Sequence, residues 1–279
     1  MKKLTAIVLA LVLALTAALA LADTVTIAVP NDPTNEGRAL LLLQANGIIT
    51  LKEDAGITAT AADIVSSIVD IKFEEVEAAM LPNVLADVDY AIINNNYALD
   101  AGLNPVKDSL IKEGSDSPYS NVLTVNEGNE DADATKALVA ALNSKKVADY
   151  ITETYDGAVI SVVDEPGDGF DPDVDYAALA GTTISVAASP TPHAQILAVA
   201  AEILKEKDIT LDIIEYADYV QPNVVVDSGE VFANYFAHYP YQENFNAENG
   251  THLVNVAPIH VEPMGLYAGK QADLTALGK

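Results

Sequence analysis

The sequence predicts an α/β protein of two similar lobes, each a mostly parallel sheet flanked by helices. Short β-branched runs alternate with helical patterns along most of the 279 residues, as in βαβ units. A strand, a turn and a helix follow one another from Thr24 and again, about half a chain later, from Thr182. Between these two openings, residues 162–175 contain six carboxylates, proline and glycine without an apolar period, which indicates a solvated linker.

Each element is read from its own pattern. The first opening is a strand at residues 24–29 and a helix from Pro33, which Asp32 or Asn31 can cap and Asn46–Gly47 should end. The second is a strand at 182–187, a helix in SPTPHAQILAVAAEILKEK and a strand in LDIIEY. In between we expect an acidic helix at 73–80, strands at 89–93 and 121–125, and helices at 133–142 and 144–155. After the linker the alternation continues to HLVNVAPIHVEPMGLYAG, and ADLTALGK reads as a short final helix.

Composition excludes several functions. The net charge of −27, from 14 basic and 41 acidic residues, would repel phosphate backbones, so we expect no nucleic-acid partner. The chain has no cysteine, which rules out a disulfide framework, a thiol nucleophile and a cysteine-held metal. Motifs for a serine nucleophile, a phosphate-binding loop or a dinucleotide are absent from the sequence. We therefore expect no catalytic residues, no enzyme activity and no cofactor.

The first 22 residues have the pattern of a secretory signal. Lys2 and Lys3 precede an apolar stretch that ends in small residues at Ala20 and Ala22. An uncleaved anchor helix is the alternative, although the apolar run is barely long enough. We expect residues 1–22 to be removed and the mature chain to be exported to the periplasm or beyond the cell, with no cysteine to carry a lipid anchor.

Arg38 is the first candidate binding residue. It is the only arginine, and it lies near the start of the helix that follows the first strand. Free backbone N–H groups, the helix dipole and a planar guanidinium all favour a carboxylate at such a place. The alternative is a surface arginine paired with Glu36 or another carboxylate.

Asparagine and aromatic residues supply the other candidates. Asn94, Asn95 and Asn96 end one expected strand and Asn121 opens the next, where amide oxygens could accept from an ammonium group, although such a cluster is also typical of a turn. In a chain that is 6% aromatic, rings concentrate between residues 219 and 241, where they could line an apolar pocket or simply pack in the core. These are Tyr219, Tyr235, Phe236, His238, Tyr239 and Tyr241. A metal site from His238, His260 and Glu262 is a further alternative, but its spacing matches no metal-ligand pattern and we expect none.

Seven strings of residues resemble the methionine-binding lipoprotein family, whose members deliver methionine to an ABC importer. The strings extend over nearly the whole mature chain and are NDPTNEGRALLLLQ, INNNYALDAGL, SPYSNVL, SPTPHAQIL, DYVQPN, ANYFAHYPY and HVEPMGLY. Their order differs from the family's, in which the SPTPHAQIL-like segment comes first and NDPTNEGR follows HVEPMGLY. A circular permutation would explain this order, with the linker joining the family's two ends and the two termini of this chain lying close together. The chain also lacks the family's lipid-bearing cysteine and has Asn95 where a glycine is common.

The resemblance implies a two-lobed periplasmic binding protein, type II-like, with the ligand cleft between its lobes. Lobe A would comprise residues 23–119 and 264–279, lobe B residues 120–263, and the two crossings between them would form a hinge. The resemblance also implies that Arg38 holds the ligand carboxylate and that Asn96 and Asn121 hold its amine, with the side chain surrounded by Tyr219, Phe236, His238 and Tyr241. The expected ligand is methionine or a related amino acid, the expected partner an ABC importer permease and the expected state a monomer. The alternatives are a methionyl dipeptide or other small zwitterion, a metal-binding protein, or an extracytoplasmic enzyme that uses carboxylates.

Overall fold

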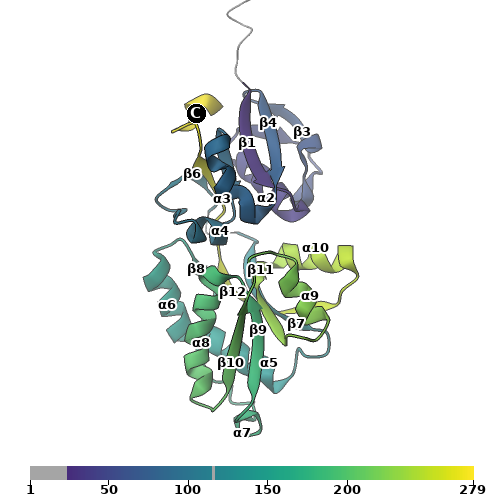
Figure 1. Ribbon diagram of the computed structural model, residues 1–279, viewed down its shortest axis with the longest axis vertical. Coiled ribbons are helices and arrows are strands. Elements are labelled where there is room, and N and C mark those ends of the chain that lie inside the picture. The colour runs from purple at the N-terminus through teal and green to yellow at the C-terminus, as the bar shows by residue number, and fades with distance from the viewer. Residues whose placement is uncertain (1–23, 115–116) are drawn as a thin grey trace, which may run out of the picture.

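The computed structural model describes residues 24–114 and 117–279, so the predicted signal segment lies outside the described residues. The described chain forms two lobes, one above the other, each built on its own sheet (Figure 1). None of the helices within the described residues combines the length and the apolar character that a membrane crossing requires. The expected α/β fold of two lobes is therefore present.

Lobe A, the upper lobe in Figure 1, contains a five-stranded sheet in the order β4-β1-β5-β13-β6. Its strands are β1 (Val25–Pro30), β4 (Ile71–Val76), β5 (Tyr90–Ile93), β6 (Ser109–Lys112) and β13 (Gly265–Ala268), beside a small pair, β2 (Ile49–Leu51) and β3 (Ile64–Ser67). Its helices are α2 (Pro33–Ala45), α3 (Leu81–Val84) and α4 (Asn95–Asp100), with short turns η1 (Gly56–Thr58), η2 (Ala61–Asp63), η3 (Ala78–Met80), η4 (Leu85–Asp87) and η6 (Leu274–Leu277). One apolar cluster lies under α2 and a second under α3 and α4, so the sheet is covered on both faces.

Lobe B contains a six-stranded sheet in the order β10-β9-β11-β7-β12-β8. Its strands are β7 (Ser120–Asn126), β8 (Ile160–Ser161), β9 (Thr183–Ala188), β10 (Thr210–Glu215), β11 (Ala233–His238) and β12 (Leu253–Val261). Its helices are α5 (Asp133–Leu142), α6 (Lys145–Tyr155), α7 (Tyr176–Leu179), η5 (Pro190–Ala194), α8 (Gln195–Lys205), α9 (Gln221–Asp227) and α10 (Tyr239–Asn249). The largest core cluster joins α5, α6 and α8 to this sheet, and α9 contributes to a smaller cluster with Ala187 of β9.

The two crossings between the lobes determine the direction of the strands that follow them. Strands β1, β4 and β5 run parallel and β9, β10 and β11 run parallel, whereas β13, β7 and β8 run antiparallel to their neighbours. Both β7 and β13 begin directly after the chain has crossed from the other lobe. A strand that enters its sheet from the cleft has to run away from it, so each crossing adds an antiparallel strand, and both sheets are mixed rather than mostly parallel as predicted.

The elements that the sequence predicted are present, with one exception. Asp32 caps α2 through its side chain, and Ser144 caps α6, as expected. The helix predicted at 73–80 is wrong, because residues 71–76 form β4, an edge strand paired in parallel with β1 along its whole length. Glutamate-rich composition favours a helix, but pairing with the neighbouring strand outweighed that propensity.

The acidic segment at 162–175 is attached to lobe B. Most of its carboxylates are exposed, as expected of a solvated linker. However, the Gly167 N–H donates to Asn143 O and its carbonyl accepts from the Lys145 N–H. A Cβ at Gly169 would lie 2.7 Å from a side-chain carbon of Ile203, so the backbone here packs directly on α8. The middle of the segment is therefore packed against lobe B rather than free in solvent.

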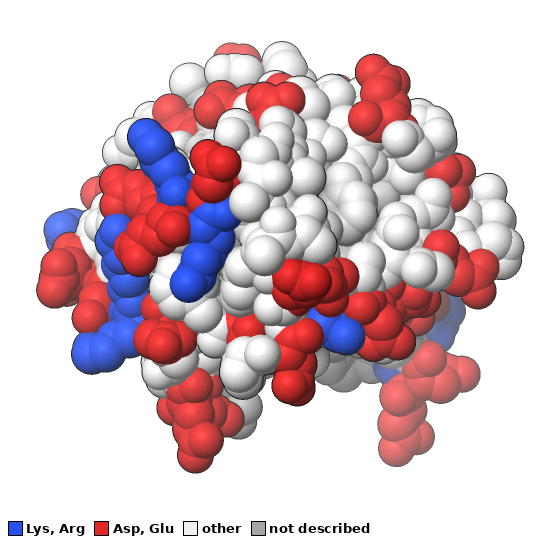
Figure 2. Space-filling view, turned by 90° about the horizontal axis from the view of Figure 1, so that it is seen from below, with Lys and Arg blue, Asp and Glu red and all other residues white. Residues whose placement is uncertain are grey.

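Charged side chains at the end of lobe B far from the cleft are mostly acidic. Figure 2 shows carboxylates spread over this surface, with the lysines gathered on one side. Lys145 forms an exposed ion pair with Asp149, and Lys146 forms one with Glu202, at 2.6 Å each. Exposed pairs of this kind contribute little to stability, so they do not fix the arrangement of the lobes.

Candidate functional site

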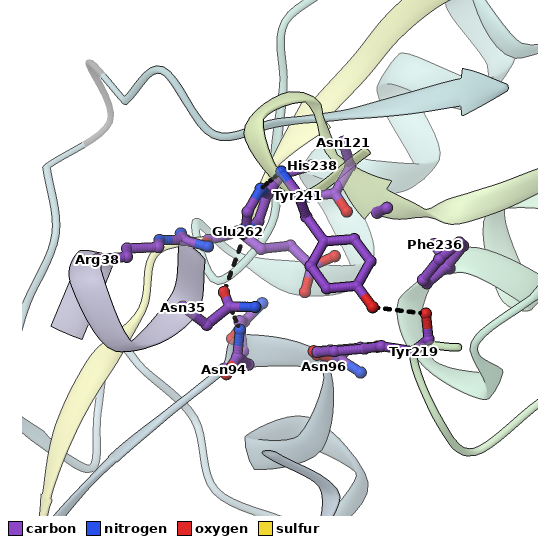
Figure 3. A pocket seen from close by; sticks show the side chains of 12 residues that line it. Asn35, Arg38, Asn94, Asn96, Asn121, Tyr219, Phe236, His238, Tyr241 and Glu262 are labelled. Atoms are coloured by element: carbon purple, nitrogen blue, oxygen red, sulfur yellow. Dashed lines mark hydrogen bonds between the residues drawn. The ribbon is translucent and has the colours of Figure 1, made fainter. Parts of the chain in front are cut away.

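A small cavity of about 20 Å³ lies between the lobes, which is room for about one water molecule, so a larger ligand would have to move the surrounding side chains or lobes apart. All seven residues predicted to bind a ligand line it, and Figure 3 shows their side chains pointing toward one another. The cavity also includes five residues outside that set, namely Asn35, Asn94, Asn95, Ala237 and Glu262. Tyr235 and Tyr239, noted in the same aromatic stretch, are not part of its lining.

Arg38 is buried at the wall of the cavity, with 3% of its surface exposed. Its Nε and Nη2 donate to the two carboxylate oxygens of Glu113 at 2.8 and 2.5 Å, and Nη2 also donates to Glu262 O at 2.7 Å. The ring of Tyr119 lies 4.3 Å from the guanidinium carbon. Burial opposes the charge of Arg38, but Glu113 outweighs it and raises the pKa. The partner is therefore Glu113 rather than Glu36, and Nη1 has no hydrogen-bond partner among the described residues.

Three asparagines reach the cavity because α4 begins directly after β5. Asn94 Nδ2 donates to Asn35 Oδ1 at 2.8 Å, and Asn95 Nδ2 donates across the cleft to Ala158 O at 2.9 Å. Asn96 Oδ1 accepts from the Tyr219 hydroxyl at 2.6 Å, also across the cleft. Within the described residues, Asn94 Oδ1, Asn95 Oδ1 and Asn96 Nδ2 are buried without a partner. Unpaired buried polar atoms are costly, so this wall is suited to a ligand with both donors and acceptors.

The opposite wall is aromatic and comes from lobe B. His238 ends β11 and caps α10, because its Nδ1 accepts from the Tyr241 N–H at 3.1 Å. Its Nε2 therefore carries the proton and donates to Asn35 Oδ1 at 3.0 Å. Burial, and then the nearby Arg38, keep the pKa of His238 well below its usual value, so the ring is neutral. The rings of Phe236 and Tyr241 lie 6.0 and 5.7 Å from that of Tyr219, and together they form an apolar surface.

Glu262 lies at the base of the cavity and is 5% exposed. Its Oε1 is 2.8 Å from His260 Nε2 and 3.2 Å from His193 Nε2, and His193 Nε2 is also 3.0 Å from Asn121 Oδ1. Burial lowers the pKa of both histidines to about 3 and raises that of Glu262. At neutral pH both imidazoles are therefore uncharged.

His193, His260 and Glu262 form a group that could hold a metal ion. One nitrogen each of His193 and His260 and one oxygen of Glu262 lie within 4.8 Å of one another. The Tyr235 hydroxyl bonds to His260 Nδ1, and His260 Nε2 lies 2.8 Å from Glu262 Oε1. A metal at His260 would require an unprotonated Nε2. His238, from the alternative considered above, bonds to Asn35 and lies outside the cluster.

Asn35 had no role in the sequence prediction, and Glu262 was considered there only as a metal ligand, not as part of the ligand cleft. Asn35 lies three residues before Arg38, on the same face of α2, so helical spacing from Arg38 could have identified it. No local pattern predicts that Glu262 contacts a ligand. It reaches the cavity because it directly follows β12, and β12 is placed by its pairing with β7. Glu113 is 75 residues from Arg38, and no local pattern links the two.

The chain matches the model of the NlpA lipoprotein family over residues 16–163 and 184–279. It is 42% identical over 142 residues to the D-methionine-binding lipoprotein MetQ of Salmonella typhimurium, covering 50% of this chain and 52% of that protein. It is 44% identical over 140 residues to Outer membrane lipoprotein 3 of Mannheimia haemolytica, covering 50% and 53%. The chain thus spans about half the length of the curated relatives it matches.

Solved structures give a similar result. A nutrient binding protein from Burkholderia cenocepacia bound to methionine is 45% identical, with a TM-score of 0.47 and coverage of 49% of this chain and 59% of that one. The Methionine Binding Protein, MetQ, is 41% identical, with a TM-score of 0.47 and coverage of 50% and 57%. The family match covers well over half of the chain. This protein belongs to the NlpA lipoprotein family.

Proposed function

We propose that this protein captures methionine, or a closely related amino acid, outside the cytoplasm and delivers it to an ABC importer. The observation that carries the proposal is the cavity between the lobes, where a buried guanidinium, unpaired amide atoms and an aromatic wall meet. Relatives 42% identical are D-methionine-binding lipoproteins, and one solved neighbour holds methionine. The protein then acts as a monomeric carrier with a permease as partner, and it performs no chemistry.

The predicted roles fit these contacts. Arg38 would hold the ligand carboxylate through Nη1, since Nε and Nη2 already bond to the protein. Asn96 and Asn121 would accept from the amine, because each amide oxygen has a second lone pair beside its bond to Tyr219 or His193. The rings of Tyr219, Phe236, His238 and Tyr241 would enclose the apolar side chain.

Ligand would be trapped by movement of the lobes about two crossings. We assign residues 23–119 and 264–279 to one moving body and 120–263 to the other. Among the described residues, five side-chain hydrogen bonds join the lobes. They link Arg38 with Glu262, Asn95 with Ala158, Tyr97 with Ala217, Tyr219 with Asn96, and His238 with Asn35. Ligand that contacts both walls would add to these bonds and shift the equilibrium toward closure.

We also propose that the order of segments is a circular permutation of the family's. The family match falls into two pieces, and the gap between them contains most of the acidic segment. Leu277 packs in the same core cluster as Val25, and both ends lie at the far end of lobe A in Figure 1. A variant that joins Lys279 to Thr24 and opens the chain within 164–183 should keep its fold and its ligand affinity. Loss of folding in that variant would contradict the proposal.

A thermal-shift screen tests the proposed function. At a hundred times its dissociation constant, a ligand adds about 2.7 kcal/mol, so methionine should raise the melting temperature by roughly 5–10 °C. The panel includes both methionine stereoisomers, the other amino acids and methionyl dipeptides. Arg38→Lys keeps a charge but loses the planar fork, and it should reduce the shift, whereas the exposed control Lys146→Ala should not. A screen in which methionine and its relatives cause no shift would refute the function.

A further inference from the structure

We propose that Glu262 makes the free ammonium group, rather than the carboxylate, the main charged feature that this cleft selects in its ligand. The proposal rests on the proposed function and specifies its ligand class, namely primary amines with a slender apolar chain, with or without a carboxylate. It assigns to Glu262 a role in specificity that Asn96 and Asn121 would support. The first ground is position, because Glu262 is the only carboxylate among the described residues that line the cavity.

The protein groups around Glu262 leave its charge uncompensated. The neutral His260 ring donates to the Glu262 carboxylate, and His193 Nε2 lies 3.2 Å away. Burial raises the pKa of Glu262, and His193, Arg38, the Asn95 side chain and the Asn96 backbone offset only part of that effect. A buried carboxylate is stabilised far more by a cation than by neutral donors. An ammonium group in the cavity would supply that cation.

The positive charge of Arg38 is, in contrast, already compensated. Glu113 bonds to it in a bidentate pair, and the Glu262 carbonyl accepts from the same nitrogen. With Glu262 ionised, as a neighbouring ammonium group would keep it, Arg38 contributes one positive charge, while Glu113 and Glu262 contribute one negative charge each. The closed site therefore has one net negative charge before a ligand enters. A zwitterion leaves that net charge unchanged, a cationic amine neutralises it and a carboxylic acid without an amine doubles it.

Two analogues of methionine each carry only one of its two charged groups and are no larger than methionine. The amine 3-(methylthio)propylamine lacks the carboxylate, and 4-(methylthio)butanoate lacks the ammonium. Calorimetric titration of the full chain should find the amine within about tenfold of L-methionine and the acid weaker by about 30-fold or more, since a buried charge would lose its partner. If the acid binds as tightly as the amine, the proposal is overturned. If L-methionine itself fails to bind, the proposed function is refuted instead.

Two matched variants distinguish a specific role from a structural one. Glu262→Gln keeps the shape and an acceptor for the histidines, and it should weaken the amine at least about tenfold while the acid gains affinity. Glu113→Gln removes the negative charge that compensates Arg38, so it should strengthen binding of the acid and reduce the preference for the amine. If Glu262→Gln weakens all three ligands by the same factor, Glu262 has only a structural role and the proposal fails. The analogue series on the unmodified protein decides the question even if a variant does not fold.

Discussion

Replacing Tyr97 by phenylalanine tests whether contacts across the cleft set the ligand affinity. The Tyr97 hydroxyl, on α4 of lobe A, donates to the carbonyl of Ala217 in lobe B at 3.0 Å. The ring packs against that of Tyr219 at a centroid distance of 4.9 Å, and phenylalanine would retain this contact. The substitution therefore removes one hydrogen bond between the lobes and little else.

The expected effect follows from the net value of that bond. A typical hydrogen bond in a protein contributes about 0.5–1.5 kcal/mol, because water replaces the lost partner when the site opens. If the bond exists only in the closed state, its loss shifts the equilibrium toward the open form by that amount. Affinity for methionine should then fall between about twofold and tenfold.

Calorimetric titration of the two proteins with methionine measures this change. Tyr267→Phe is the matched control, because the Tyr267 hydroxyl is buried in lobe A without a partner among the described residues, and its loss should leave the affinity unchanged. Equal affinities for Tyr97→Phe and the unmodified protein would refute the idea that bonds between the lobes contribute to closure. A larger loss for Tyr267→Phe than for Tyr97→Phe would refute it as well.

Two further predictions concern stability. Gly37→Ala would place a Cβ 2.3 Å from a backbone carbonyl oxygen and should lower the free energy of unfolding by about 1–3 kcal/mol in urea, whereas Gly167→Ala, with nothing closer than 4.0 Å, should change it little. The second concerns pH: burial lowers the pKa of His193 and His260 to about 3, so the unfolded chain binds more protons than the folded one between about pH 6.5 and 3. The unfolding free energy should thus fall as the pH decreases through this window, and a double His193→Gln, His260→Gln variant should show a shallower fall. The exposed His252→Gln control should retain the full pH dependence, and an identical slope in all three proteins would contradict the assignment.

Local sequence patterns were sufficient to predict the fold class and the elements of the two βα openings. Hydrophobic alternation located the strands and caps located the helices, as at Asp32 and Ser144, because these features depend on neighbours in the chain. The prediction failed at β4, where residues with helical propensity became a strand because β1 lay alongside with free hydrogen-bonding groups. An edge strand is determined by its partner, which a local pattern does not contain.

The candidate site shows the same limit. The family resemblance implied the seven ligand-lining residues, whereas residue types at strand ends and helix starts only made them candidates for a crevice of the α/β architecture. Which atoms remain available to a ligand was not predictable. Whether Arg38 is free or paired depends on Glu113, and whether Glu262 is charged depends on His193 and His260, all of which reach the site through tertiary contacts.

The two crossings between the lobes are also tied to each other at the level of the cleft. Glu113, after β6, donates its N–H to Met264 O at 3.0 Å, and its side chain accepts from the Met264 N–H at 2.9 Å. A single connecting strand would let one lobe twist freely relative to the other. Two connecting segments that are hydrogen-bonded side by side can bend together about the axis that passes through both. They resist a twist of one lobe relative to the other. Since Glu113 also holds Arg38, the same carboxylate that restricts the motion to one axis touches the residue proposed to grip the ligand.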